Sequence, residues 1–501
     1  MASNFVLDVW GWITNLPPFS RWSTDTMCLC ICASKSSSTK TSLKLSIIKS
    51  PRNQNPFISF TIFADFHMPI SLWTSTPIPL KSSAQTSLTE AETVHLFFDI
   101  LDTVFSYGPS KRSSFRRSQV TIEDNFRDVL NLSFLTLSFL ICIYEAPYDL
   151  RCGCLDTLRL QLSNSTCRDA LKLLVRMLGS NLEEQWMRSL NLGMTNWMVE
   201  LQSSNHSVRT ISPAFSYALS ASGLWKVQLY CPVIAMSLED PSATTQDERL
   251  LFSLRYQQLE GVVQLAYKVI IKQNWIDIVV AVDNIRCDVV SLVSETLMAE
   301  RGYGSGEKHF PSRISLQVTP TQQSDVVSVS VSKSSDNPTQ EIGLEKALEG
   351  GFEPPGTYLG IRVSTTETVT VSVKPWKFEQ SVHGASGKLN WFLHDGINGR
   401  EVFSSKPSKF SLLQPRAWFR DRYSSVYRPF TKDGGVIFAG DEYGESVWWK
   451  VGPGAFGKTM GWEIKGSIGI TYWPNKQRTF YSETRNLQFK EILYLNLPKP
   501  A

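Results

Sequence analysis

The sequence predicts an α+β protein in which a helical region is combined with a large antiparallel, β-rich and sandwich-like domain. Apolar residues alternate with polar ones in the first part of the chain, recur at helical spacing in the second, and alternate again in many short runs in the third. A chain of 501 residues is also too long for one hydrophobic core. We therefore expect an N-terminal segment (1–80), a helical region (81–205) and a β-rich domain (206–501).

The N-terminal segment holds three alternating runs between Thr26 and Phe66, separated by turn-forming residues. These runs predict an antiparallel meander, and its strands could pair with the C-terminal domain so that the helices form an insertion. Cys28, Cys30 and Cys32 alternate in the first run and would share one face of a strand. We interpret them as buried, reduced thiols rather than metal ligands.

The helical region starts at Ser87-Leu88-Thr89-Glu90, which has the spacing of a capping box. Apolar residues at helical spacing follow, and Gly179 separates the last two of the predicted helices. After the first helix, the expected helices cover Ile122–Tyr144, Pro147–Leu162, Cys167–Leu178 and a stripe from Ser180 to Leu201.

The most apolar run of the chain extends from Val129 to Tyr144. A helix needs about 20 apolar residues to cross a bilayer. This run is shorter, contains Asn131 and Ser133, and is bracketed by Asp128 and Glu145. It therefore predicts a buried core helix and not a membrane span.

The β-rich domain is expected to contain one amphipathic helix at about 247–272, with Leu251, Leu254 and Leu259 on its apolar face. Short alternating runs and turn residues dominate after it, which is typical of a β-sandwich.

The segment Gly452–Thr459 matches the phosphate-loop pattern G-x-x-x-x-G-K-[ST]. A phosphate loop must be followed by a helix whose N-terminus binds the phosphates. The residues after Thr459 are rich in glycine and read as strands, Pro453 lacks an amide donor, and no aspartate follows to hold magnesium. We interpret the match of Gly452, Gly457, Lys458 and Thr459 as chance, and expect a loop that joins two strands.

A group of charged and aromatic residues near the C-terminus is the strongest candidate site. Arginines and acids of opposite charge are crowded among aromatic residues, so the group is an ion-pair network, a recognition surface for protein or glycan, or a set of catalytic carboxylates. The candidate residues are Trp418, Arg420, Asp421, Arg422, Tyr427, Asp441, Glu442 and Trp448.

Other chemistry lacks its signatures. No C-x-x-C, H-E-x-x-H or G-x-S-x-G occurs, so no metal, cofactor or nucleophile elbow is expected. The formal net charge of +4 is small, so no nucleic-acid partner is expected. The first residues include Asp8 and no basic run, which argues against a secretory signal. We expect a cytoplasmic or nuclear protein, with the plastid as the alternative.

Three stretches resemble a plant-specific family of uncharacterised proteins: S-N-L-E-E-Q-W-M-R-S, G-L-W-K-V-Q-L-Y-C-P-V-I-A-M and W-F-R-D-R-Y-S-S-V-Y-R-P-F. The resemblance implies a plant source and brings no site residues. The expected function is non-catalytic binding, with a protein as the partner and a glycan as the alternative. A carbohydrate-active or other hydrolytic enzyme on the β-sandwich is the alternative function, and no membrane partner is expected.

Overall fold

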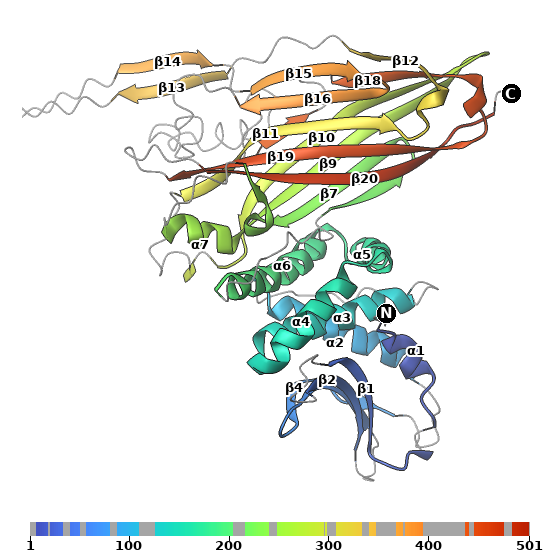
Figure 1. Ribbon diagram of the computed structural model, residues 1–501, viewed down its shortest axis with the longest axis vertical. Coiled ribbons are helices and arrows are strands. Elements are labelled where there is room, and N and C mark those ends of the chain that lie inside the picture. Colours follow the sequence, from blue (N-terminus) through green and yellow to red (C-terminus); the bar gives the residue numbers. More distant parts are fainter. Residues whose placement is uncertain are drawn as a thin grey trace, which may run out of the picture.

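The computed structural model has an N-terminal sheet at one end, a layer of helices in the middle and a β-sandwich at the other end (Figure 1). It confirms the predicted α+β class, with helices combined with a large antiparallel β-rich region. The structure describes residues 7–18, 21–33, 41–50, 57–80, 88–109, 126–203, 216–239, 248–294, 296–297, 307–332, 340–346, 367–373, 376–393, 436–439, 445–474 and 483–499.

The N-terminal sheet has the strand order β1-β2-β3-β4, with β5 paired to β3. Its strands are β1 Thr26–Ala33, β2 Ser42–Lys49, β3 Phe57–Asp65, β4 Ile70–Thr74 and β5 Ile78–Pro79. The predicted meander is therefore present, and its strands pair with one another instead of with the described strands of the C-terminal domain. Apolar residues of β2 and β3 share one continuous hydrophobic core with the helices.

The three alternating cysteines do not share a buried face as predicted. Cys28 and Cys30 are exposed, whereas Cys32 is buried. The reason is a register shift between Cys30 and Cys32 in the pairing of β1 with β2, which turns both Ile31 and Cys32 toward the core.

Seven α-helices occur in the described residues, and those of the helical region agree closely with the predicted spans. A capping box at the start of α2 is formed by Thr89 and Glu92, whereas Ser87 of the predicted box lies outside the described residues. Gly179 ends α5 with a positive φ of 76°, a conformation that glycine adopts without strain. The helices are α1 Val9–Thr14, α2 Glu90–Ser106, α3 Phe126–Tyr144, α4 Tyr148–Leu162, α5 Ser165–Leu178, α6 Ser180–Ser203 and α7 Glu248–Tyr256.

The apolar helix α3 lies at the centre of the helical layer and contacts α1, α2, α4, α5 and α6. The most apolar 18-residue window of α3 has a mean hydropathy of 1.6, and 83% of that window is buried inside the protein. By length and composition it is the one described helix that could cross a bilayer. The prediction of a buried helix is confirmed for this segment.

The helix predicted at 247–272 is half wrong. Helix α7 ends at Tyr256, and the chain continues as the long strand β9 Gln257–Ile271. Gly261 and the β-branched residues after it disfavour a helix. Leu259, Val263 and Leu265 are buried at alternate positions, which is the period of a strand.

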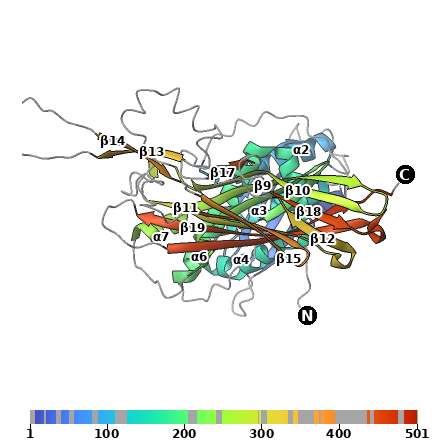
Figure 2. The same ribbon diagram turned by 90° about the horizontal axis from the view of Figure 1, so that it is seen from above.

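The sandwich consists of two antiparallel sheets with a shared core. The β10 sheet has the order β12-β18-β10-β9-β7-β6, with β17 paired to β10, and the β19 sheet has the order β15-β16-β11-β19-β20-β8. Three tryptophans meet between the sheets. The ring centroid of Trp462 lies 4.9 Å from that of Trp449 and 5.7 Å from that of Trp225. Figure 2 shows the long strands of both sheets side by side above the helices.

The strands of the β10 sheet are β6 Ser216–Ala221, β7 Leu224–Pro232, β9, β10 Ile276–Ser291, β12 Val326–Val331, β17 Val436–Ala439 and β18 Ser446–Val451. Those of the β19 sheet are β8 Ser237–Leu238, β11 Glu307–Pro320, β15 Trp376–His383, β16 Ser386–Leu393, β19 Thr459–Pro474 and β20 Glu483–Asn496. A separate pair is formed by β13 Gln340–Lys346 and β14 Glu367–Val373.

Candidate functional site

Most of the candidate residues lie outside the described residues. This applies to Trp418, Arg420, Asp421, Arg422, Tyr427, Asp441 and Glu442. Trp448 lies on β18, which is flanked by β12 and β10 in the β10 sheet. The candidate site that can be built from the structure is therefore the surface around Trp448.

Trp448 is placed on the outer face of the sheet by the alternation of β18. Val447, Trp449 and Val451 point into the sandwich core, so Trp448 and Lys450 point outward. The indole of Trp448 is 45% exposed, and its Nε1 donates to Ser446 Oγ at 3.4 Å. A tryptophan with this much apolar area in water is a candidate anchor for a partner.

The neighbours of Trp448 across the sheet are small or half-buried. Ser330 on β12 and Val279 on β10 flank it, and Ser328 and Asp277 flank Lys450 in the next row. Side chains this short leave the indole standing above its surroundings. Lys450 Nζ lies 3.9 Å from the centroid of Trp275, which is cation–π geometry.

We call this surface the Trp448 face. Its charge is mainly positive, because the exposed Lys268 pairs with Val279 and the exposed Lys272 precedes the strand, whereas Asp277 is the one acid within its rows. The Trp448 face consists of Lys268, Lys272, Trp275, Asp277, Val279, Ser328, Ser330, Ser446, Trp448 and Lys450.

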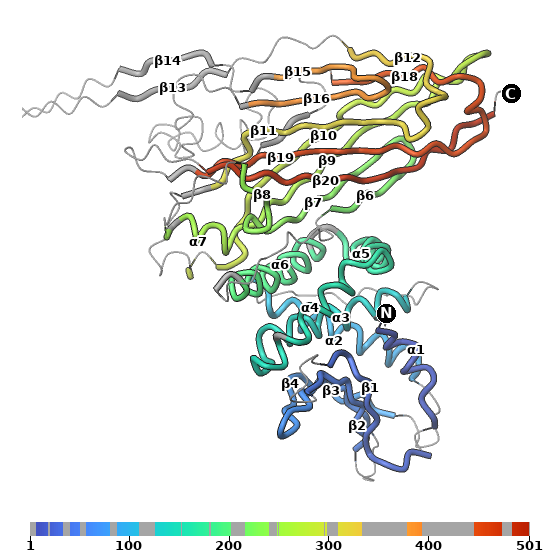
Figure 3. The backbone as a smooth tube through the Cα atoms, viewed as in Figure 1, coloured from blue at the N-terminus to red at the C-terminus, as the bar shows by residue number. Residues whose placement is uncertain are grey.

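A second polar group, which the sequence did not reveal, joins the helical layer to the β10 sheet. The buried Glu183 of α6 accepts hydrogen bonds from the hydroxyls of Tyr217 and Tyr230. Burial, and then the charge of Glu183, raise the pKa of both tyrosines, so they remain donors. Figure 3 shows β6 and β7, the strands that carry them, at the side of the sheet next to α5 and α6.

The same contact contains an ion pair. Arg188 donates from Nε and Nη2 to Glu260 at 2.7 and 2.9 Å. The hydrogen bond to Glu260 raises the pKa of Arg188 further, which keeps the pair charged. Gln258 donates to Glu260 at 2.6 Å and accepts from Asn191 at 2.7 Å. Apart from the contact of Arg188 Nη2 with Glu184 Oε2 at 3.4 Å within α6, the bonds of this group run between α6 and the sheet or within the sheet, so the group is a structural joint.

A serine and a histidine meet beneath α7. Ser253 Oγ lies 3.0 Å from His309 Nδ1, and Gln257 Oε1 lies 2.5 and 2.8 Å from these two atoms. Nucleophilic catalysis needs an accessible serine. Ser253 is 3% and His309 1% exposed, and an amide stands where a carboxylate would orient the imidazole. This arrangement fixes the end of α7 and offers no route for a substrate.

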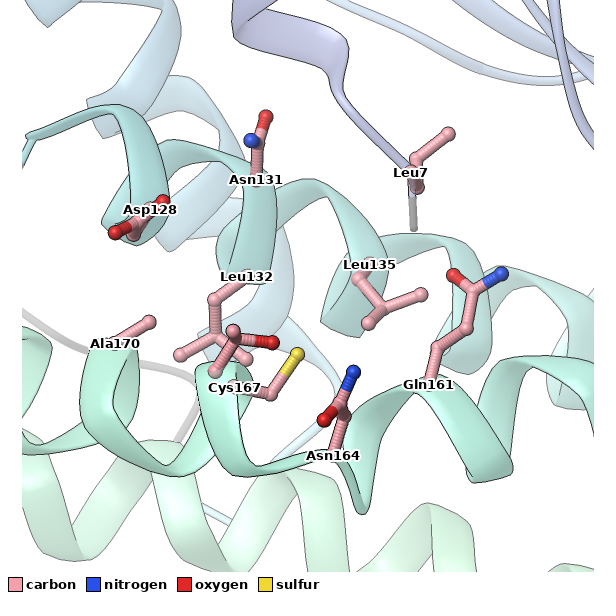
Figure 4. A pocket seen from close by; sticks show the side chains of 10 residues that line it. Leu7, Asp128, Asn131, Leu132, Leu135, Gln161, Asn164, Cys167 and Ala170 are labelled. Carbon is pink, nitrogen blue, oxygen red and sulfur yellow. The ribbon is translucent and has the colours of Figure 1, made fainter. Parts of the chain in front are cut away.

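A small cavity of about 50 Å³ lies between the residues that precede α1 and the helices α3, α4 and α5. Figure 4 shows the sulfur of Cys167 pointing toward the space between Leu135 and Asn164. Burial raises the pKa of Cys167 to about 11, with Asp128 adding to the effect, so the thiol stays protonated and is a poor nucleophile. The lining residues are Leu7, Asp128, Asn131, Leu132, Leu135, Gln161, Asn164, Thr166, Cys167 and Ala170.

The segment that matches a phosphate loop has strands on both sides, because β18 ends at Val451 and β19 begins at Thr459. The two strands belong to different sheets, so the loop crosses from one layer of the sandwich to the other. Two of its backbone amides already donate to carbonyl oxygens of the protein. The N–H of Gly452 donates to Asp325 O at 2.7 Å, and that of Lys458 donates to Ala455 O at 3.2 Å. A phosphate loop needs such amides to converge on its ligand.

Among the described residues, no group of three or more histidine, cysteine, aspartate or glutamate side chains could hold a metal ion. The described part of the chain offers an exposed aromatic and basic surface, the Trp448 face, and several buried polar groups.

No protein-family model matches the chain, and no curated protein matches it at a significant level. Among solved structures, Clostridium perfringens delta-toxin is 9% identical with a TM-score of 0.20, covering 56% of this chain and 95% of the toxin. The Clostridium perfringens NetB toxin in its membrane-inserted form is 10% identical with a TM-score of 0.18, covering 56% of this chain and 97% of the toxin. Likenesses at these TM-scores carry no argument about the function of this chain.

Proposed function

We propose that this protein binds another protein, without catalysis, through the Trp448 face. The observation that carries the proposal is the exposed side chain of Trp448, which lies on β18 between Ser330 of β12 and Val279 of β10. Tryptophan on a rigid strand buries a large apolar area on binding and loses little conformational freedom, which is why it dominates the energetics of many interfaces.

The charge of this surface favours a partner with acidic groups. Lys268, Lys272 and Lys450 outnumber Asp277, and surfaces of opposite charge associate faster than neutral ones. The hydrolytic enzyme considered from the sequence has less support. Most glycoside hydrolases need a pair of carboxylates around an accessible cleft. The Trp448 face has one carboxylate, and the cavity beside α3 holds about 50 Å³.

The test compares two exposed aromatic residues on opposite sheets. Trp448→Ala should remove one or more partners captured from cells that express the protein, and protease treatment of the captured material should abolish the interaction where glycosidase treatment does not. Tyr494→Ala is the matched control, because Tyr494 is exposed on β20 of the other sheet. Both variants should melt like the wild type. If Trp448→Ala keeps every partner that Tyr494→Ala keeps, the proposed function is wrong.

A further inference from the structure

Two buried cysteines from different elements meet between the N-terminal sheet and the helical layer. Cys32 lies near the end of β1 and Cys154 in the middle of α4, and both belong to the core that the sheet shares with the helices. The register shift in β1 turns Cys32 inward, and α4 contacts both β1 and β2 (Figure 1). The thiol of Cys32 donates a hydrogen bond to the sulfur of Cys154, so the two sulfur atoms are in direct contact.

The surroundings of Cys154 favour its thiolate. Its sulfur accepts hydrogen bonds from the Cys32 thiol and from the backbone N–H of Leu43, and these bonds lower the pKa of Cys154 although burial opposes them. In Cys231 and Cys287, which are equally buried, burial raises the pKa of the thiol. The thiolate is the form of cysteine that attacks an oxidant. Its hydrogen bonds therefore distinguish Cys154 from thiols that only fill the core.

Strand β1 can expose this pair without unfolding the rest of the core. It is the last strand at one end of the described sheet, and of its eight residues only Ile31 and Cys32 are buried. Segments with few buried contacts open locally at a lower free-energy cost than the centre of a core does. A small oxidant can therefore reach Cys154 when the end of β1 opens.

We propose that Cys32 and Cys154 are a redox-sensitive pair, which hydrogen peroxide converts to a disulfide between β1 and α4. The thiolate of Cys154 attacks one peroxide oxygen, the O–O bond breaks, and Cys154 becomes a sulfenic acid while hydroxide leaves and takes up a proton from water. The thiol of Cys32 then attacks the sulfenic sulfur. The S–S bond forms, and the sulfenic oxygen leaves as water with the proton of Cys32.

The disulfide ties the N-terminal sheet to the helical layer. It closes a loop that includes β2 to β5 and the helices α2 and α3. A crosslink restricts the unfolded chain, and the effect is larger for a longer loop. We therefore expect the oxidised protein to melt at a higher temperature than the reduced protein.

The test treats the reduced full-length protein with hydrogen peroxide, blocks the remaining thiols with N-ethylmaleimide and analyses a proteolytic digest by mass spectrometry. We expect a crosslinked peptide that contains Cys32 and Cys154 and that dithiothreitol splits. The melting temperature should rise with this crosslink and return after reduction. Cys32→Ala should abolish the crosslink and leave Cys154 as a sulfenic acid that dimedone labels. Cys28→Ala is the matched control, because Cys28 is an exposed thiol on the same strand, and it should form the crosslink like the wild type.

Three outcomes would overturn the proposal. In the first, peroxide oxidises the exposed Cys28 and Cys30 and leaves Cys32 and Cys154 reduced, so the pair only fills the core. In the second, Cys32 is joined to Cys142 of α3, a third buried thiol whose charge acts on it. In the third, the crosslink appears only at peroxide concentrations at which circular dichroism shows an unfolded chain. None of these outcomes affects the proposed function, which capture with Trp448→Ala tests separately.

Discussion

We expect the folded protein to lose stability in mild acid because of one buried histidine. His309 on β11 lies beneath α7, and its Nδ1 lies 2.8 Å from Gln257 Oε1. An amide oxygen only accepts, so Nδ1 carries the proton. Nε2 then has no hydrogen-bond partner among the described residues. Burial lowers the pKa of His309 to about 3, and the charge of Arg485 adds to this effect.

The direction of this pH effect follows from the protonation of His309 in the native and unfolded states. Native His309 stays neutral, whereas the unfolded chain binds a proton below a pKa of 6.5. Its contribution to stability is therefore fully present above pH 6.5, falls as the pH drops below that value, and stops falling near pH 3. Between pH 7 and pH 5 the loss from this single group is about 2 kcal/mol. The other groups around the ring are Ser253 of α7 and Tyr472 of β19, whose ring centroid is 5.2 Å away.

The assay is urea unfolding at pH 7 and pH 5 with two variants. His309→Asn keeps an N–H that can donate to Gln257 but does not titrate, so it should lose about 2 kcal/mol less than the wild type over this interval. His383→Asn is the control, because His383 is exposed at the end of β15, and it should behave like the wild type. Equal losses in the wild type and His309→Asn would refute the reasoning, since carboxylates would then account for the whole pH dependence.

Three further predictions concern packing, charge and the phosphate-loop match. Gly466→Ala should lower the free energy of urea unfolding by roughly 1–3 kcal/mol, because its Cβ would stand 2.0 Å from Phe489 Cζ; a variant as stable as the wild type would show that the ring moves freely. Arg188→Ala should lower the free energy of unfolding by roughly 3 kcal/mol in the same measurement, because it leaves Glu260 buried without its cation. A loss near zero would show that this ion pair does not stabilise the contact between α6 and the sheet. Calorimetry with Mg-ATP should give no saturable heat with the wild type or with Lys458→Ala; micromolar binding that the substitution abolishes would overturn the chance interpretation.

The helices were predictable because each of them repeats one period over many residues between clear end signals. Gly179 marks the end of α5, and the spans of α3 to α6 agree with the predicted ones within a few residues. Sequence spacing alone did not choose between two overlapping capping boxes. Thr89 is the N-cap of α2 and Glu92 stands three residues after it, so these two residues form the box.

The candidate site was predictable only in part. The aromatic and charged composition near the C-terminus drew attention to Trp448, and the alternation of β18 explains its exposure. The surroundings of Trp448 depend on residues far away in the chain, because strand pairing places Val279 and Ser330 beside it. The joint of Glu183, Arg188 and the β10 sheet was missed for the same reason. From the sequence alone, the polar residues of α6 are expected to face solvent, because nothing in their spacing indicates that the β10 sheet covers them.

The one large error, the extension of α7 through residue 272, coincides with the buried polar cluster. Leu292 N donates to Tyr256 O at 2.7 Å, and this bond holds the chain where helix becomes strand. Immediately after it, Gln257 Oε1 accepts from both Ser253 and His309, which ties the last turn of α7 to β11. Leu292 and His309 come from segments distant in sequence, so local spacing could not indicate these contacts. The end of α7 is thus set by tertiary contacts, and the group that fixes it is the same one whose neutral histidine makes this part of the fold sensitive to acid.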